Sequence, residues 1–253
     1  MTGTTQSTTG PRHRARHALA FAALCAALVG VVAVSSAGAT QANVLGKTRH
    51  TPAPDCPKDT AQHPCEGIGS VTGFPLVADG EKRPMKVHHN GKLVAWAIDL
   101  SRPKKSQRNF FGSLFKSSRY GKAPTARIAV IKHKGRTKTY KLLRQSPVVK
   151  LAGALGRKQL ITLDKPLTVR KGQIVALTVP TWASNFASHI SRHRNRWRGS
   201  RSRRNCSPKS SNIRDIRAFA HKSRPQQKVG SVRGYACDYT SARLLYWAYY
   251  VRG

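Results

Sequence analysis

The sequence predicts an all-β protein, an antiparallel β-sandwich of jelly-roll-like type with eight or nine strands and one short helix. Apolar and polar residues alternate in several short runs, and turn-forming residues separate these runs at close spacing. Strand-like and helix-like segments do not alternate regularly along the chain, as they would in a parallel α/β sheet. Together these observations favour packed antiparallel sheets.

The first strand pair is expected around Asn90-Gly91, because both residues tolerate the positive φ that a tight hairpin turn requires. Strand-like runs at residues 85–89 and 92–100 flank this dipeptide. In the second run, alternate apolar side chains fall on one face of the expected strand: Val94, Trp96, Ile98 and Leu100.

One helix is expected next, between residues 107 and 118. Its apolar residues recur at the spacing of one or two helical turns: Phe110, Phe111, Leu114 and Phe115. The remaining expected strands are residues 126–132, 137–143, 159–163, 167–169, 173–179, 229–239 and 242–251. The last of these runs is apolar on both faces, which is typical of a central strand.

The first 39 residues have the composition of a secretory signal peptide. Basic residues at positions 12, 14 and 16 precede an uncharged apolar run from Ala18 to Val34, and Ala37-Gly38-Ala39 supplies small residues for cleavage. The run is short for a membrane span of about 20 residues, so an uncleaved anchor is the alternative interpretation. We expect a secreted or cell-wall-associated protein without a membrane span after cleavage. An irregular segment at 40–66 would precede a sandwich domain at 67–253.

Four cysteines remain after the expected cleavage, an even number that favours two disulfides in an exported chain. Three pairings are compatible with four cysteines. We expect Cys56 to pair with Cys65 in a short loop, and Cys206 to pair with Cys237 across an irregular part of the chain. A metal site built on Cys56, His63 and Cys65 is the rival interpretation, but it lacks a nearby fourth ligand.

Positive charge dominates the composition, with 46 Lys and Arg against 9 Asp and Glu and a net charge of +37. So few carboxylates exclude a calcium cage or a two-metal carboxylate site. The sequence also holds no metal, cofactor or catalytic motif. A hydrolase remains an alternative only if folding brings together scattered carboxylates such as Asp99 and Asp238.

The segment 189–205 is the most strongly basic part of the chain. Seven arginines and one tryptophan occur there without a carboxylate: Arg192, Arg194, Arg196, Trp197, Arg198, Arg201, Arg203 and Arg204. In an extended chain, neighbouring arginines about 6 Å apart repel by about 0.7 kcal/mol in water. A helix would add like-charge pairs four residues apart. We therefore expect a mobile loop.

This basic segment also carries the expected function. Arginine side chains bind phosphate and carboxylate oxygens in pairs, and Trp197 would add a stacking surface. We expect a non-enzymatic module that uses the segment to bind anionic polymers of the cell envelope. A solvated insertion that binds nothing specific is the alternative. No recognition helix or zinc finger is present, so sequence-specific nucleic acid is not an expected partner.

A lectin-like, glycan-binding module is a second alternative. Its ligand platform would consist of aromatic side chains, if folding leaves them exposed on one face: Trp96, Trp182, Trp247, Tyr246, Tyr249 and Tyr250.

Two segments carry a resemblance to a known group of proteins. Residues 167–180, with a Lys-Gly turn before a strand, and the tail from Cys237 to Tyr246 resemble parts of uncharacterised secreted jelly-roll-like proteins of high-GC bacteria. The resemblance implies a sandwich fold and export. It implies no activity, cofactor or site residue.

Overall fold

A computed structural model describes residues 42–56, 66–135 and 137–253, which belong to one compact unit, Thr40–Gly253. The expected signal peptide at residues 1–39 and its cleavage site lie outside the described residues. Within the described ranges, no helix has the length and apolar character needed to cross a membrane.

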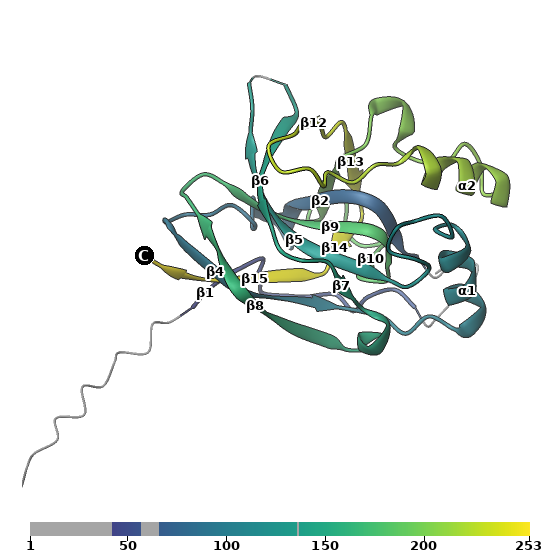
Figure 1. Ribbon diagram of the computed structural model, residues 1–253, viewed down its shortest axis with the longest axis horizontal. Coiled ribbons are helices and arrows are strands. Elements are labelled where there is room, and N and C mark those ends of the chain that lie inside the picture. The colour runs from purple at the N-terminus through teal and green to yellow at the C-terminus, as the bar shows by residue number, and fades with distance from the viewer. Residues whose placement is uncertain (1–41, 57–65, 136) are drawn as a thin grey trace, which may run out of the picture. The chain divides into compact units, whose positions relative to one another are not determined.

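The described chain is mostly β-structure with two α-helices (Figure 1). The strands are β1 Asn43–Leu45, β2 Ile68–Ala78, β3 Glu81–Lys82, β4 Gly91–Asp99, β5 Thr125–His133, β6 Thr139–Gln145, β7 Val149–Lys150, β8 Lys158–Val169, β9 Ile174–Ala183, β10 Phe186–Ala187, β11 Arg196–Gly199, β12 Val232–Gly234, β13 Cys237–Thr240, β14 Arg243–Leu244 and β15 Tyr246–Arg252. The helices are α1 Lys105–Ser113 and α2 Ile213–Lys222, with short 3-10 turns at η1 Ala152–Ala154 and η2 Arg203–Asn205.

The strands form two main antiparallel sheets. The smaller sheet has the order β1-β15-β4-β8, and the larger has the order β12-β6-β5-β9-β2-β11-β13, with β3 and β7 paired at its sides. A separate pair joins β10 to β14. Figure 1 shows β1, β15, β4 and β8 as one layer, with the larger sheet packed beside it and its edge strands β12 and β13 on the side away from that layer. The predicted antiparallel β fold is therefore confirmed, but the curled seven-strand sheet does not identify a jelly roll.

The larger sheet carries buried apolar residues on both of its faces. Its inner face meets the smaller sheet in the main core, where Val130 of β5 and Leu177 of β9 belong to the same apolar cluster as Trp96 of β4. Its outer, concave face carries a second cluster that includes Phe74 and Tyr140. Neighbouring residues of one strand thus enter different clusters, as the period of a strand requires.

The hairpin predicted at Asn90-Gly91 is wrong. Neither residue has a positive φ, and β4 pairs with β15 and β8. In the expected first strand, 85–89, the structure has one isolated bridge, from Lys86 to Ile174. Gly91 has a different role, because a Cβ there would stand 2.1 Å from the carbonyl oxygen of Val251.

The tight turn that the structure does contain uses Asp79-Gly80. Asp79 has φ 52° and Gly80 has φ 85°, and these two residues join β2 to β3 with Ala78 opposite Glu81. Asp-Gly is as favourable a turn dipeptide as Asn-Gly, since both residues can occupy the left-handed region. This turn was not predicted, because β3 is only two residues long and shows no strand pattern of its own.

Several other boundaries differ from the predicted ones. The run at 126–132 lies within β5, and the runs at 137–143 and 173–179 lie within β6 and β9 except for one or two residues at their starts. Residues 159–163 and 167–169 belong to one strand, β8. This strand contains a bulge, because residues 163–166 lie opposite the single residue Val94 of β4. The runs at 229–239 and 242–251 are each divided, into β12 and β13 and into β14 and β15.

The predicted short helix is confirmed as α1, and its apolar side packs on the larger sheet. The ring of Phe111 lies 5.1 Å from that of Trp182 in β9, while Phe110 is 38% exposed. A second helix, α2, was not predicted, although the sequence contains its start: the Asn212 side chain accepts a hydrogen bond from the Asp215 backbone at 2.8 Å. Both helices lie at the same end of the sheets in Figure 1.

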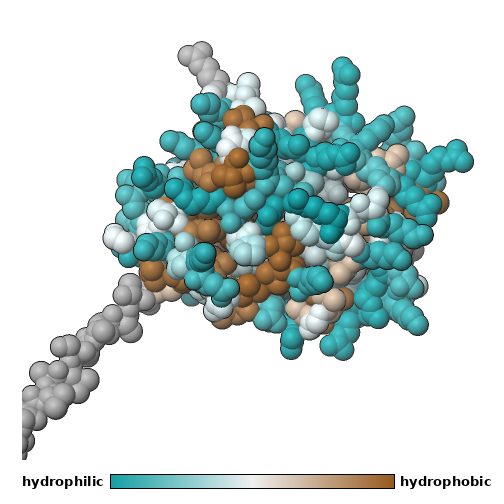
Figure 2. All heavy atoms as spheres, in the orientation of Figure 1, coloured by the Kyte–Doolittle hydropathy of each residue, from teal (hydrophilic) through white to brown (hydrophobic). Residues whose placement is uncertain are grey.

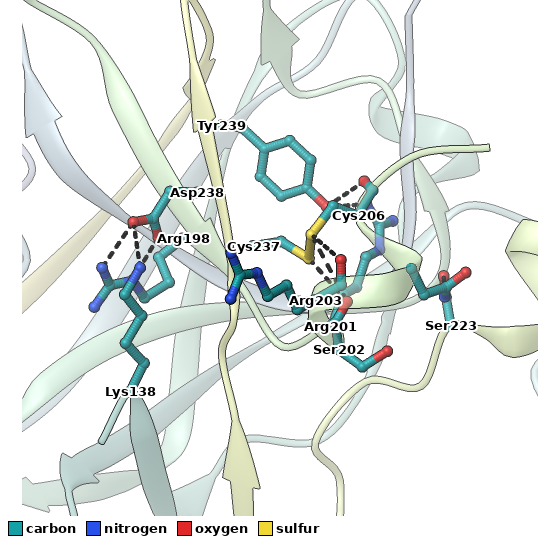
Figure 3. Close-up of a disulfide and its surroundings, with 11 residues drawn as sticks. Lys138, Arg198, Arg201, Ser202, Arg203, Cys206, Ser223, Cys237, Asp238 and Tyr239 are labelled. Atoms are coloured by element: carbon teal, nitrogen blue, oxygen red, sulfur yellow. Dashed lines mark hydrogen bonds and ion pairs between the residues drawn. A yellow bond between two sulfur atoms is a disulfide. The ribbon is translucent and has the colours of Figure 1, made fainter. Parts of the chain in front are cut away.

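The predicted Cys206–Cys237 disulfide is confirmed, with a Cα–Cα distance of 5.3 Å (Figure 3). It joins the turn after β11 to β13 and closes a loop of 31 residues that contains α2 and β12. In the chain-entropy model, a loop of this length contributes about 3.7 kcal/mol. The second predicted disulfide includes Cys65, which lies outside the described residues.

Candidate anion-binding cleft

The basic segment is largely ordered structure, so its interpretation as a mobile loop is wrong. β11 lies in the larger sheet between β2 and β13 and forms ladders with both. Trp197 is only 2% exposed, and its ring stacks on that of Tyr239 at 4.2 Å and 17°. The hydrogen bonds of two ladders and the burial of this ring outweigh repulsion of about 0.7 kcal/mol per arginine pair. Trp197 therefore offers no stacking surface to a ligand.

Three of the seven arginines have partners within the fold. Arg194 donates to Asp79 at 2.5 Å, and Arg198 makes a two-point contact with Asp238 at 2.6 and 2.9 Å. Arg201, 7% exposed, donates to two neutral groups, the carbonyl of Gly69 and the hydroxyl of Tyr239, while its buried Nε has no hydrogen-bond partner among the described residues. These contacts give the three side chains structural roles.

The contact of Arg198 with Asp238 changes the titration of both groups. Burial alone would raise the pKa of Asp238, but hydrogen bonds from Arg198 and Lys138 outweigh it and hold that pKa below its usual value. The hydrogen bond to Asp238 in turn raises the pKa of Arg198. Lys138, at 3.0 Å from the carboxylate, completes the cluster at one side of the disulfide in Figure 3.

The other four arginines of the segment are exposed: Arg192, Arg196, Arg203 and Arg204. Across the described residues, none of these four forms an ion pair. Hydrophilic side chains project from most of the face drawn in Figure 2, with apolar patches between them. The segment thus divides into arginines that hold the fold and arginines that remain available to an anion.

Arg196 and Arg198 face a cleft on the concave side of the larger sheet. The alternation of β11 directs Trp197 into the main core, so the residues on either side of it lie on the opposite face of the strand. The cleft has a volume of about 610 Å³. This lies within the range of about 300 to 1,000 Å³ that is usual for small-molecule sites.

The rim of this cleft is basic. Five cationic side chains line it, from the β2–β3 hairpin, the segment that follows β3, and β11: Lys82, Arg83, Lys86, Arg196 and Arg198. No carboxylate is among its lining residues. In the part of the chain that the structure describes, Arg198 is the one member of the five with an ion-pair partner. We call this site the cationic cleft.

The floor of the cationic cleft is apolar. Phe74 of β2 and Tyr140 of β6 are buried with their rings 5.3 Å apart, and half-buried Leu76 and Ile174 continue the surface. His133 stands at the edge, with its ring 5.2 Å from that of Tyr140. The cleft therefore combines an apolar surface with an unbalanced positive charge.

The aromatic platform of the lectin alternative is not formed by the expected residues. Five of the six rings are buried: Trp96, Trp182, Trp247, Tyr246 and Tyr250. Tyr249 is partly exposed. A sugar ring stacks on an exposed aromatic face, so a single half-buried tyrosine does not provide the expected platform.

The carboxylates considered for a hydrolase are also separate. Asp99 ends β4 in the smaller sheet, whereas Asp238 lies in β13 of the larger sheet and binds Arg198 and Lys138. A different pair of carboxylates, Glu66 and Asp55, does interact. The pKa of Glu66 is raised mainly by burial of its side chain, and the negative charge of Asp55 raises it further. The hydroxyl of Ser188 donates to Asp55 at 2.5 Å, so the pair belongs to a network that ties the N-terminal segment to the residues after β10.

No group of three or more His, Cys, Asp or Glu side chains that could hold a metal ion occurs among the described residues. Comparisons with protein-family models, with curated proteins and with solved structures found no match.

Two of the five cleft cations, Arg196 and Arg198, were among the predicted site residues, and the other three were not. The alternation of arginines at 192, 194, 196 and 198 is itself a period-two pattern that could have indicated a strand. Lys82, Arg83 and Lys86 had no such local pattern. They join the site because the β2–β3 hairpin lies beside β11 in the sheet.

Proposed function

We propose that this protein is an exported, non-enzymatic module that binds anionic polymers of the cell envelope. The observation that carries the proposal is the cationic cleft, where five basic side chains occur without a carboxylate. The exposed arginines of the segment 189–205 would extend the contact beyond the cleft. The proposed module is a two-layer, sandwich-like β domain.

The chemistry of the exposed cations supports an anionic ligand. Guanidinium groups bind phosphate and carboxylate oxygens through paired hydrogen bonds, and a cation without an acidic neighbour need not give up an internal partner to do so. A net charge of +37 would also raise the rate at which an anionic polymer meets the protein. Export is supported by the composition of residues 1–39 and by the Cys206–Cys237 disulfide.

The test is the salt dependence of binding to polyphosphate for three forms of the protein. One variant replaces the four exposed arginines of the segment by Gln: Arg192, Arg196, Arg203 and Arg204. A matched control removes the same charge from exposed residues elsewhere: Lys104, Lys105, Arg214 and Arg217. Arg194, Arg198 and Arg201 are left intact, because their loss would also disturb the fold.

If the four arginines each neutralise a phosphate of a flexible polymer, their removal should lower the slope of log affinity against log salt by about 2.8. The control variant should keep most of the slope of the natural sequence. Equal losses in the two variants would show that the charge acts as a diffuse surface property. A natural protein that does not bind polyphosphate even at low salt would contradict the proposed function itself.

A further inference from the structure

We infer that the cationic cleft binds a small amphiphilic anion, in which one phosphate or carboxylate group is joined to an apolar body. The inference rests on the proposed function for the sign of the ligand's charge. It goes beyond that function in the class of ligand, because a hydrophilic polymer would leave the apolar floor without a partner.

The floor is the first argument for an apolar body. Leu76 and Ile174 are half-buried and line the cleft together with the buried side chains of Met85 and Phe74. The lining of the cleft exposes more apolar than polar surface. Covering such surface is favourable for an apolar group in proportion to the area removed from water, and is of no benefit to a hydrated sugar-phosphate chain.

The rim is the argument for an anionic head group. Lys82 and Arg83 come from the hairpin side of the cleft and Arg196 comes from β11, so basic side chains approach from more than one element. None of these three has an ion-pair partner in the described ranges. A head group bound among them would meet cations without competing for an internal acid.

The cleft lies on strands of the larger sheet, β2, β6, β9 and β11, with the segment that follows β3 beside them. Farther along the concave face the space is filled by Tyr235 and Gln226, whose side chains share a hydrogen bond of 2.7 Å. Gln226 also donates to the carbonyl of Tyr140 at 3.0 Å and is bonded to Thr72 through its backbone N–H. The side chains of Tyr235 and Gln226 thus fill one part of the concave face, whereas the part lined by the cations remains open.

The experiment measures binding of dodecyl phosphate, below its micellar concentration, to the full chain by titration calorimetry. Inorganic phosphate tests the head group alone, and dodecyl maltoside tests an apolar chain without charge. A rim variant carries Lys82→Gln and Arg196→Gln, and a floor variant carries Leu76→Thr and Ile174→Thr. The matched control carries Arg214→Gln and Arg217→Gln, which remove the same charge from exposed positions on α2.

We expect saturable binding of dodecyl phosphate at one molecule per chain and no comparable binding of either control ligand. The rim and floor variants should each weaken it by about tenfold or more, and the α2 control should bind as the natural protein does. Dodecanoate should bind in the same way if the site accepts either head group.

Three results would overturn the inference. Equal affinity of the rim variant and the α2 control would show that the cleft cations do not hold the head group. Equal affinity for inorganic and dodecyl phosphate would show that the floor contributes nothing. Polyphosphate binding without saturable amphiphile binding would reject this inference alone, whereas loss of both would also reject the proposed function.

Discussion

The role of each arginine in this protein depends on the group that meets its guanidinium. Because acids are scarce, buried arginines donate mainly to neutral oxygens, and the buried Nε atoms of Arg127 and Arg201 have no hydrogen-bond partner among the described residues. Arg243 donates to the carbonyl of His50 and the hydroxyl of Thr48, and Arg127 donates to the side chain of Gln227. Burial lowers the pKa of both arginines. Few carboxylates pair with a cation in the described residues, and Asp238 is one of them.

Asp238→Asn should lower the free energy of unfolding at pH 7 by about 1 to 2 kcal/mol, because it removes a carboxylate that accepts two hydrogen bonds from Arg198. The pKa of Asp238 is depressed in the fold, so its contribution is present at neutral pH and is lost as the pH falls through that depressed value, below 3.8. The difference between the variant and the natural protein should therefore shrink at low pH.

Urea unfolding at pH 7 and pH 3 measures this difference. Asp164→Asn is the control, since Asp164 is exposed and forms no ion pair among the described residues. Similar effects of the two substitutions at pH 7 would mean that the contact with Arg198 adds nothing to stability.

Contacts between neighbouring elements determine which segments of this chain form strands and turns. β11 is the clearest case, because its charged side chains argue against order while its place between β2 and β13 supplies hydrogen bonds on both sides. The dipeptides Asp79-Gly80 and Asn90-Gly91 also show this dependence on neighbouring elements. Asp79-Gly80 forms a tight hairpin, whereas Gly91 is required by the approach of another strand.

Alanine substitutions should separate these two glycine roles. Gly80→Ala should cost about 1 kcal/mol, because Gly80 has a positive φ but open space around the added Cβ. Gly91→Ala should cost about 3 kcal/mol or more, because the Cβ would overlap the carbonyl oxygen of Val251 and force β4 away from β15. Chemical denaturation of both variants tests the order, and a larger cost at Gly80 would contradict it.

For the molecule as a whole, electrostatic self-repulsion is the dominant feature. The described residues contain few ion pairs, and these converge on two carboxylates, Asp79 and Asp238. Most of the 46 Lys and Arg residues of the sequence therefore have no acid to balance them. Such an excess opposes the compact state and favours association with anions.

The melting temperature should rise as NaCl is increased from 0.01 to 0.15 M. This change shortens the Debye length from about 30 to about 8 Å and so screens repulsion between distant cations. NaCl and KCl should act alike if screening is the cause. A melting temperature that falls with added salt would indicate that the few ion pairs outweigh the repulsion.

The sequence alone determined the features that depend on local pattern. Alternating apolar residues predicted β5, β6, β9 and most of β4, and the spacing of four apolar residues predicted α1. Two of the cysteines, Cys206 and Cys237, were correctly paired. These features are accessible because a strand period, a helix period and a loop between cysteines are all read within one short stretch of chain.

Only the tertiary structure decided the cationic cleft. Its floor joins residues of β2, β6 and β9, and its rim joins the β2–β3 hairpin to β11, segments that are more than 100 residues apart in sequence. Local alternation can separate the face of Arg196 and Arg198 from that of Trp197, but which strands these faces meet depends on the register with β2 and on the core contact of Trp197. Charge repulsion, the one local argument for this segment, is smaller than the ladder bonds and ring burial that neighbouring strands supply.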